Sequence, residues 1–143
     1  MITTYLCFLT IAATPSLQNG DVRLINAADN TNRSGRLEVY YEGRWGTVCD
    51  DLFDSNGAMV VCRQLGLNPV GAIAVTRAGF GQGVDPIWLD NVDCTGSEEN
   101  IDSCPHNAWG SHNCAHFEDA GVICLRKSIQ CIHIYICSSV WDP

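Results

Sequence analysis

The sequence predicts a small α+β domain held together by disulfide bonds, and three observations support this prediction. The chain has 143 residues, which is room for one domain. Nine of them are cysteines, a density typical of exported proteins in an oxidising environment. Short strand-like segments surround a single clear helical pattern, with polar or glycine-rich stretches between them. We therefore expect a small sheet, one main helix and long loops.

The first half of the central region predicts three strands and the main helix. Short apolar or alternating segments typical of strands lie at 22–25, 36–41 and 45–48. A polar turn at 42–44 joins the last two segments into a hairpin. Asp54 or Ser55 caps a helix over about 55–65, and Gly66 ends it.

The second half predicts shorter elements. Residues 68–86 are rich in glycine and favour loop, with one strand at about 72–76. Further buried strands are expected at 87–89 and 120–125. A one-turn helix is expected to start at 97–99, because acidic residues at this point suit the positive end of a helix dipole.

The two ends of the chain differ from its middle. Residues 1–16 are predicted to be a signal peptide, because an apolar stretch at 5–13 is followed by small residues and a proline. Residues 126–143 form an atypical tail, in which 129–136 alternates as a strand does. No apolar run reaches the roughly 18–20 residues that a membrane-spanning helix needs.

Charge and motif content exclude several classes of function. The chain carries 8 basic and 16 acidic residues, a formal net charge of -8, so nucleic acid is not expected as a specific partner. We find no G-x-S-x-G nucleophile motif and no C-x2-C pair of the kind that zinc sites favour. The prediction is therefore a protein that is not an enzyme.

The cysteine spacing is the strongest signal in the sequence. Twelve residues separate Cys49 from Cys62, and nine residues fill each of the three gaps between the next four, Cys94, Cys104, Cys114 and Cys124. Six cysteines allow fifteen pairings, and spacing alone does not choose among them.

Five segments together resemble the scavenger receptor cysteine-rich (SRCR) domain family. They are Gly35-Arg36-Leu37-Glu38-Val39, Gly43-Arg44-Trp45-Gly46-Thr47-Val48-Cys49-Asp50-Asp51, Val60-Val61-Cys62-Arg63-Gln64-Leu65-Gly66, Ile87-Trp88-Leu89-Asp90-Asn91-Val92-Asp93-Cys94 and His116-Phe117-Glu118-Asp119-Ala120-Gly121-Val122-Ile123-Cys124. The resemblance covers residues 22–125. Two cysteines of the eight-cysteine form, near Arg33 and Leu67, are both absent, which indicates the six-cysteine type.

This resemblance implies a fold and a disulfide pairing. The fold is a curved antiparallel sheet packed on one main helix with long loops. The implied bonds are Cys49–Cys114, Cys62–Cys124 and Cys94–Cys104. The first two close long loops, each worth about 4 kcal/mol through restriction of the unfolded chain.

A bond between Cys49 and Cys114 would gather acidic residues that are distant in sequence. Asp50 and Asp51 follow the first cysteine, and Glu118 lies four residues after the second. Crowded carboxylates repel one another, and a hard cation such as calcium relieves the repulsion. The resemblance implies calcium at these three acids, with a second site at Asp51, Asp90 and Asn113. The alternative interpretation is a set of solvated surface acids.

Other residues are candidates for ligand contact or modification. The strand leading to Trp45 resembles a bacterial-surface-binding motif of the family, which makes Arg36, Glu38 and Arg44 candidates, although hairpin core is the stronger interpretation. Four arginines are candidates for a basic patch that binds sulfate or phosphate: Arg33, Arg36, Arg44 and Arg77. Asn32 begins an N-glycosylation sequon in a polar loop.

The sequence thus predicts an extracellular recognition module, either secreted or part of a cell-surface protein. We expect calcium-assisted binding of polyanionic, microbial-surface or protein ligands. One alternative is an accessory domain of a larger secreted enzyme or of a multi-domain scavenger-type receptor. Another is a zinc or thiol enzyme, in which the six central cysteines would be free.

Overall fold

The structure is a computed structural model that describes residues 15–26, 28 and 31–126. Most of the predicted signal peptide and nearly all of the predicted tail lie outside the described residues, together with Cys7, Cys131 and Cys137. Within the described part, no helix has both the length and the apolar character needed to cross a membrane.

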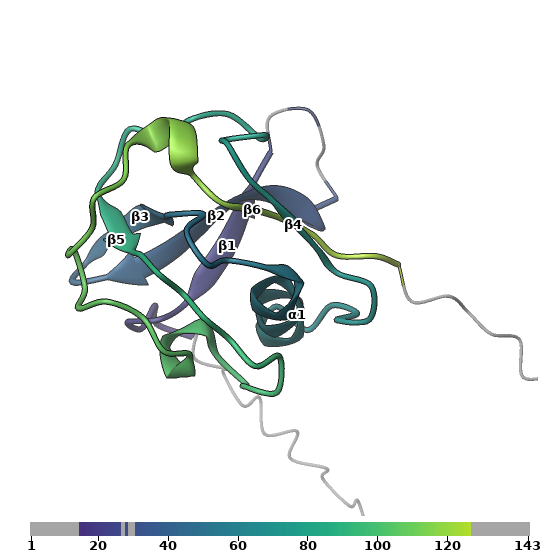
Figure 1. The fold of residues 1–143 in the computed structure, drawn as a ribbon. Coiled ribbons are helices and arrows are strands. Elements are labelled where there is room, and N and C mark those ends of the chain that lie inside the picture. Colours follow the sequence, from purple (N-terminus) through teal and green to yellow (C-terminus); the bar gives the residue numbers. More distant parts are fainter. Residues whose placement is uncertain (1–14, 27, 29–30, 127–143) are drawn as a thin grey trace, which may run out of the picture.

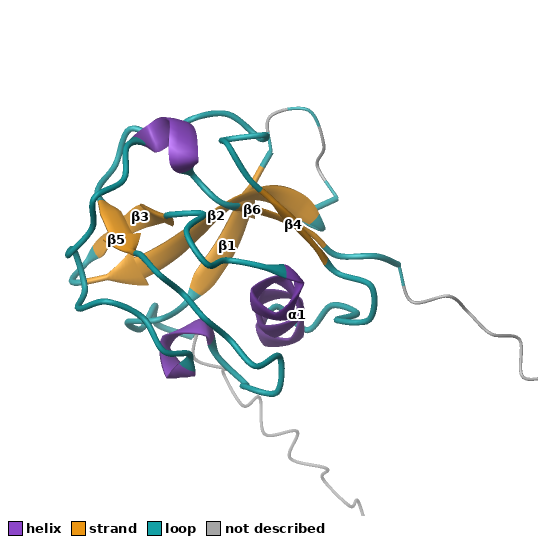
Figure 2. Cartoon of the chain, in the orientation of Figure 1, coloured by secondary structure: helices purple, strands orange, loops and turns teal. Residues whose placement is uncertain are grey.

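Six short strands form one sheet, and all six match strands expected from the sequence (Figures 1 and 2). The sheet has the order β4-β6-β2-β3-β5, and β1 pairs with β2 as well. The strands are β1 (Val22–Ile25), β2 (Ser34–Tyr41), β3 (Arg44–Val48), β4 (Ile73–Val75), β5 (Ile87–Leu89) and β6 (Gly121–Ile123). Because β2 pairs with three neighbours, it is the centre of the fold.

One strand pair corrects the expected all-antiparallel sheet. β3 and β5 are parallel, with Thr47 opposite Ile87 and Val48 opposite Leu89. A parallel pair needs a long crossover, and the chain between these strands contains the main helix, β4 and a glycine-rich loop. The sheet is therefore mixed.

The main helix, α1 (Ser55–Gln64), begins where the sequence predicts and packs on the sheet (Figure 2). The Asp54 side chain accepts hydrogen bonds from the backbone N–H groups of Asn56 at 2.8 Å and Gly57 at 3.3 Å, which caps the helix. Gly57 is needed because a Cβ there would lie 2.7 Å from the Phe53 ring.

Three disulfides join the elements, and the pairing implied by the resemblance is confirmed. The Cα–Cα distances are 6.2 Å for Cys49–Cys114, 5.7 Å for Cys62–Cys124 and 4.8 Å for Cys94–Cys104. The second bond ties α1 to the end of β6 beneath a core of fully buried residues that includes Leu37, Val39, Val61, Leu89 and Val122. A chain this small gains much of its stability from such cross-links.

Two 3-10 helices, η1 (Ile101–Ser103) and η2 (His116–Glu118), lie at opposite ends of the molecule in the view of Figure 1. The one-turn helix expected to start at 97–99 is wrong. The carboxylate of Glu98 instead accepts hydrogen bonds from the backbone N–H groups of Thr95 and Gly96, both at 2.9 Å. This contact closes a tight loop, so the helical turn starts only at Ile101.

Candidate functional site

The Cys49–Cys114 disulfide brings together the two segments that carry the predicted metal-binding acids. The Asp50 backbone N–H donates to the Glu118 carbonyl oxygen at 2.8 Å, and Cys49 forms a β-bridge with Asp119. η2 therefore lies directly against the chain that leaves β3. Acids from three separate segments of the chain share one end of the molecule, which we call the acidic end: Asp50, Asp51, Asp90 and Glu118.

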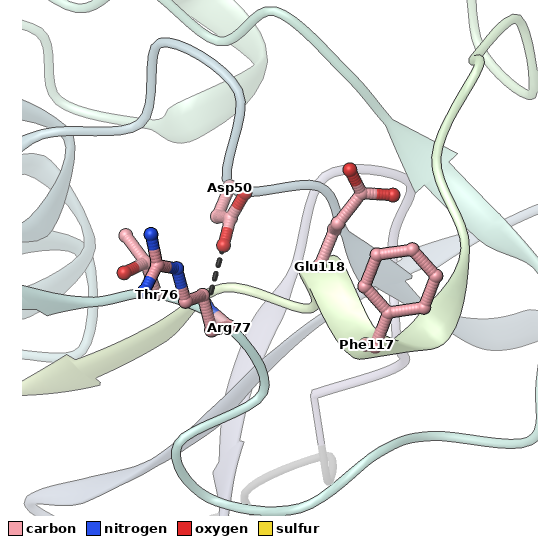
Figure 3. Close-up of a pocket in the computed structure, with 5 residues that line it drawn as sticks. All are labelled: Asp50, Thr76, Arg77, Phe117 and Glu118. Carbon is pink, nitrogen blue, oxygen red and sulfur yellow. Dashed lines mark hydrogen bonds between the residues drawn. The ribbon is translucent and has the colours of Figure 1, made fainter.

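Two of these acids also support the local backbone. Asp50 Oδ2 accepts a hydrogen bond from the Arg77 backbone N–H at 2.6 Å. Glu118 Oε2 accepts one from the Ala115 backbone N–H at 2.8 Å. Figure 3 shows the Asp50 carboxylate directed at this part of Arg77, while the Glu118 carboxylate points away from it. Each carboxylate keeps one oxygen that is not used in these contacts.

Asp51 and Asn113 both lie close to the disulfide sulfur of Cys114. Asp51 Oδ2 is 3.9 Å from this sulfur and Asn113 Oδ1 is 3.6 Å from it. A sulfur in a disulfide carries no proton, so these contacts are not hydrogen bonds. A carboxylate oxygen of Asp51 also lies within 4.8 Å of one from Asp90. The three residues predicted for the second metal site are therefore close to one another.

The electrostatic surroundings of Asp51 are unfavourable to its negative charge. Partial burial raises the pKa of Asp51, and the charges of Asp90, Glu118 and Asp50 raise it further, in that order. No hydrogen-bond donor contacts its carboxylate among the residues that the structure describes. A cation at this point would remove the repulsion.

Asp90 is the fixed member of the acidic end. Its side chain is buried, with 1% of the residue exposed. It accepts hydrogen bonds from the Asn91 backbone N–H at 2.7 Å and from the side-chain amides of Asn91 and Asn107, both at 3.2 Å. These donors compensate the burial of the Asp90 carboxylate and hold it next to Asp51, where the two like charges repel.

An open cleft of about 550 Å³ lies beside the acidic end, between the loop after β4 and η2 (Figure 3). Its lining residues are Asp50, Thr76, Arg77, Phe117 and Glu118. Two large apolar side chains near it are exposed, Phe117 at 58% and Leu52 at 61%. Leu52 also has φ of 61°, a left-handed conformation that costs energy for leucine. The sequence indicates Arg77 only as one of four arginines of a basic patch, and it does not indicate Phe117 or Leu52, because nothing in their local pattern points to this cleft.

The candidate residues of the hairpin are arranged differently. Glu38 is 3% exposed and forms ion pairs with Arg23 at 2.6 Å and Arg36 at 2.8 Å. Arg36 also donates to the carbonyl oxygens of Gly81 and Gln82. Arg44 is exposed at the turn. A buried, paired carboxylate has little freedom to contact a ligand, so the structural interpretation of the hairpin is favoured.

The four arginines of the predicted basic patch do not line a single cleft. Arg77 lines the cleft beside Asp50, whereas Arg33 lines a different cleft near the end of β6. Asn32, the first residue of the sequon, is exposed in the loop before β2.

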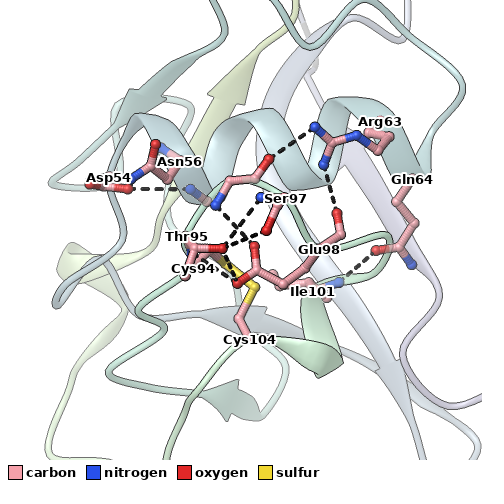
Figure 4. The surroundings of a disulfide bond; sticks show 12 residues. Asp54, Asn56, Arg63, Gln64, Cys94, Thr95, Ser97, Glu98, Ile101 and Cys104 are labelled. Carbon is pink, nitrogen blue, oxygen red and sulfur yellow. Dashed lines mark hydrogen bonds between the residues drawn. A yellow bond between two sulfur atoms is a disulfide. The ribbon is translucent and has the colours of Figure 1, made fainter.

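A second cluster of potential metal-binding residues, Cys94, Glu98 and Cys104, is a structural corner (Figure 4). The two cysteines form a disulfide bond with each other, so neither has a thiolate that could bind a metal. Arg63 donates to the carbonyl oxygens of Glu98 at 2.6 Å and Gly96 at 2.9 Å, which ties α1 to this loop. The Thr95 backbone N–H, with further donors, lowers the pKa of Glu98 to about 2.

Comparison with known proteins identifies the fold. The sequence model of the scavenger receptor cysteine-rich domain matches residues 27–125. The chain belongs to the SRCR family. Its three disulfides agree with the six-cysteine type.

Two related proteins are much longer than this chain. It is 50% identical over 114 residues to a scavenger receptor cysteine-rich domain superfamily protein from Patiria pectinifera, covering 80% of this chain and 10% of that protein. It is 45% identical over 127 residues to galectin-3-binding protein from Rattus norvegicus, covering 89% of this chain and 21% of that protein. The chain thus spans a tenth to a fifth of the length of these relatives.

Solved structures agree with the fold. The SRCR domain of mouse MARCO, crystallised in a dimeric form, is 50% identical with a TM-score of 0.60, covering 64% of this chain and 86% of that one. The third SRCR domain of murine neurotrypsin is 47% identical with a TM-score of 0.65, covering 73% and 94%. Family membership supports an extracellular recognition module, a setting in which three disulfides are stable.

Proposed function

We propose that this SRCR domain binds ligands with the help of calcium at the acidic end. The observation that carries the proposal is the position of Asp51, which has three acidic neighbours and no hydrogen-bond donor among the described residues. Asp50, Asp51 and Glu118 would hold one ion. Asp51, Asp90 and Asn113 would hold a second ion, so that Asp51 serves both.

The donor set fits calcium in its chemistry. Calcium prefers carboxylate and amide oxygens and takes six to eight of them. Each site offers three side chains of these two kinds, so part of the coordination shell is left for water or a ligand. The affinity of such an open site is on the order of 0.1–1 mM, which suits an extracellular protein.

The ligand class follows from the open coordination positions. An anionic group on a ligand can complete the shell of the ion, which explains how a chain with net charge -8 would bind polyanions or a microbial surface. The exposed side chain of Phe117 beside the acids adds an apolar contact that suits a protein ligand. No catalytic step is proposed.

Calcium titration calorimetry on the native chain and two variants tests the proposal. Asp51→Asn removes the shared acid, and we expect calcium binding to fall at least tenfold. Glu98→Gln is the matched control, because this acid lies in the structural corner and its loss leaves calcium binding unchanged.

Binding of heparin, dextran sulfate and polyglutamate is then measured in calcium and in EDTA. Equal ligand binding in both conditions would contradict the calcium mechanism.

A second candidate function is an accessory role within a longer protein. The observation that favours it is the coverage, since the chain spans 10% and 21% of two relatives. The larger protein would be a secreted enzyme or a multi-domain receptor, and the SRCR domain would supply its recognition surface. Sequencing the full-length transcript tests this candidate, and a transcript that encodes only these 143 residues would reject it.

A further inference from the structure

A second cleft, of about 360 Å³, lies where the loop after α1 meets the end of β6. A smaller hollow of about 220 Å³ adjoins it and shares Arg33, Leu125 and Arg126. The lining residues of the larger cleft are Arg33, Gly66, Leu67, Asn68, Leu125 and Arg126. None of them belongs to the acidic end, so this cleft is separate from the proposed calcium sites.

The charge of this cleft is unusual for the molecule. Two arginines line it and no acidic residue does, in a chain with 16 acidic residues. Other arginines have structural partners: two of them pair with Glu38, and Arg63 donates to loop carbonyls. Among the residues that the structure describes, Arg33 and Arg126 form no ion pair. Two such groups at one cleft favour an anion.

Hydrogen bonds tie the backbone of both arginines to the surrounding frame. The Cys124 backbone N–H donates to the Arg33 carbonyl oxygen at 2.7 Å, which joins the start of β2 to the end of β6. The Asn68 side-chain amide donates to the Arg126 carbonyl oxygen at 3.4 Å. The Cys62–Cys124 disulfide holds the same region to α1. The side chains are thus presented by a cross-linked frame.

The cleft also has an apolar side. Leu67 and Leu125 line it, and Leu125 is 44% exposed. Leu125 lies over Gly71, where a Cβ would come within 2.9 Å of its Cδ1. Val70 and Ile73, on the adjoining loop and strand, are exposed as well, at 70% and 47%. Paired cations beside apolar surface suit a ligand with both characters.

We propose that this cleft binds an anionic group carried on an apolar body, such as a sulfate, sulfonate or phosphate ester of an aromatic ring or hydrocarbon chain. Arg33 and Arg126 hold the anion, and Leu67 and Leu125 contact the apolar body. Binding here needs no calcium. The inference goes beyond the proposed function, because it concerns different residues and a different response to EDTA.

NMR shift titration of the full chain with 2-naphthalenesulfonate and 2-naphthyl phosphate tests this inference, in EDTA throughout. We expect dissociation constants on the order of 1 mM, with shifts centred on Leu67 and Leu125. Inorganic sulfate alone and 2-naphthol alone should each bind at least fivefold more weakly. The two anionic probes distinguish a preference for sulfonate from one for phosphate.

Variants separate this site from general charge attraction. Arg33→Gln combined with Arg126→Gln should weaken both anionic probes at least fivefold, and it keeps the glycosylation sequon. Arg33→Lys with Arg126→Lys should retain most of the binding. Arg44→Gln is the control and should change nothing, because Arg44 is an exposed arginine at the turn after β2, whereas Arg33 lies just before the start of that strand. Unchanged binding in the double Gln variant, equal loss in the control, or no binding by the native chain would each overturn the inference.

Discussion

Two loops of this molecule carry acidic residues beside a disulfide, and the pKa of a carboxylate is raised in one loop and lowered in the other. At the acidic end, burial and three like charges raise the pKa of Asp51. At the structural corner, hydrogen-bond donors lower the pKa of Glu98 to about 2. Glu98 accepts from the Thr95 backbone and hydroxyl groups and from the Gly96 backbone, whereas no described donor contacts the carboxylate of Asp51.

The difference separates Glu98, which stabilises its own loop, from Asp51, which is available to bind a cation. Donors offset the charge of Glu98, and no neighbouring acid among the described residues raises its pKa, so a cation would gain little there. Asp90 also accepts hydrogen bonds, but it lies beside Asp51, whose charge no described donor offsets. A carboxylate among other carboxylates gains from a cation. Both loops hold potential metal-binding atoms within 4.8 Å of one another, and the acidic neighbours of Asp51 distinguish the acidic end from the structural corner.

Removal of each disulfide tests this comparison with the largest expected effect. Replacing Cys49 and Cys114 by Ala opens a loop with a sequence separation of 65 and should lower the free energy of unfolding by about 4 kcal/mol. Replacing Cys94 and Cys104 opens a loop with a separation of only 10 and should cost about 3 kcal/mol. Denaturant unfolding measures both values.

Calcium binding should respond differently from stability in these variants. It should vanish in the first variant, which separates Asp51 from Glu118, and persist in the second where that variant is folded. If calcium binding survives without the Cys49–Cys114 bond, the acidic end does not depend on this cross-link.

Acidification should affect the two loops in opposite directions when calcium is absent. Because the folded-state pKa of Asp51 is raised, the folded chain binds its proton more readily than the unfolded chain, and stability rises as pH falls from that raised value towards 3.8. Because the pKa of Glu98 is lowered from 4.5 to about 2, its stabilising contribution is present above pH 4.5 and is lost as pH falls towards 2.

Melting curves between pH 7 and pH 2 should therefore separate two variants. Asp51→Asn should remove the gain that occurs as pH falls towards 3.8, and Glu98→Gln should remove the loss that occurs between pH 4.5 and about 2. In neutral EDTA, the first variant should melt at the native temperature or above it, and the second below it. Identical pH profiles for both variants would mean that the two loops do not differ as described.

The smallest expected effect concerns the backbone of the acidic end. Leu52→Asn should raise the free energy of unfolding by about 0.5–1 kcal/mol, because asparagine adopts the left-handed conformation more easily than leucine. Thermal unfolding measures the change, and Leu125→Asn is the control, an exposed leucine that is not among the residues of positive φ. Equal effects of both substitutions would remove backbone strain as the cause.

Much of the fold could be predicted from local patterns. The strand at 22–25, the capping of α1 by Asp54 and the six bonded cysteines are confirmed because each depends on residues close together in sequence or on a family pattern. The error at Glu98 has a local cause as well. Acidic residues favour the start of a helix, but a glutamate that reaches back to Thr95 and Gly96 closes a loop instead.

The candidate site was only partly predictable. Asp50, Asp51 and Glu118 were grouped through an implied disulfide, and the structure brings them together. The sequence indicates Arg77 only for a basic patch and does not indicate Phe117, because the loop after β4 reaches the acidic end only in the folded chain.

By itself, the sequence determined the α+β class, the six strands of the described residues, the start of the helix and the family, because periodicity, caps and cysteine spacing depend on neighbouring residues. Only the tertiary structure decided that β3 and β5 run parallel, that Glu38 is buried between two arginines, and that Arg33 meets Arg126 at one cleft. These facts depend on distances between segments far apart in the chain. Such distances follow from how the sheet, helix and disulfides pack together, which no local pattern records.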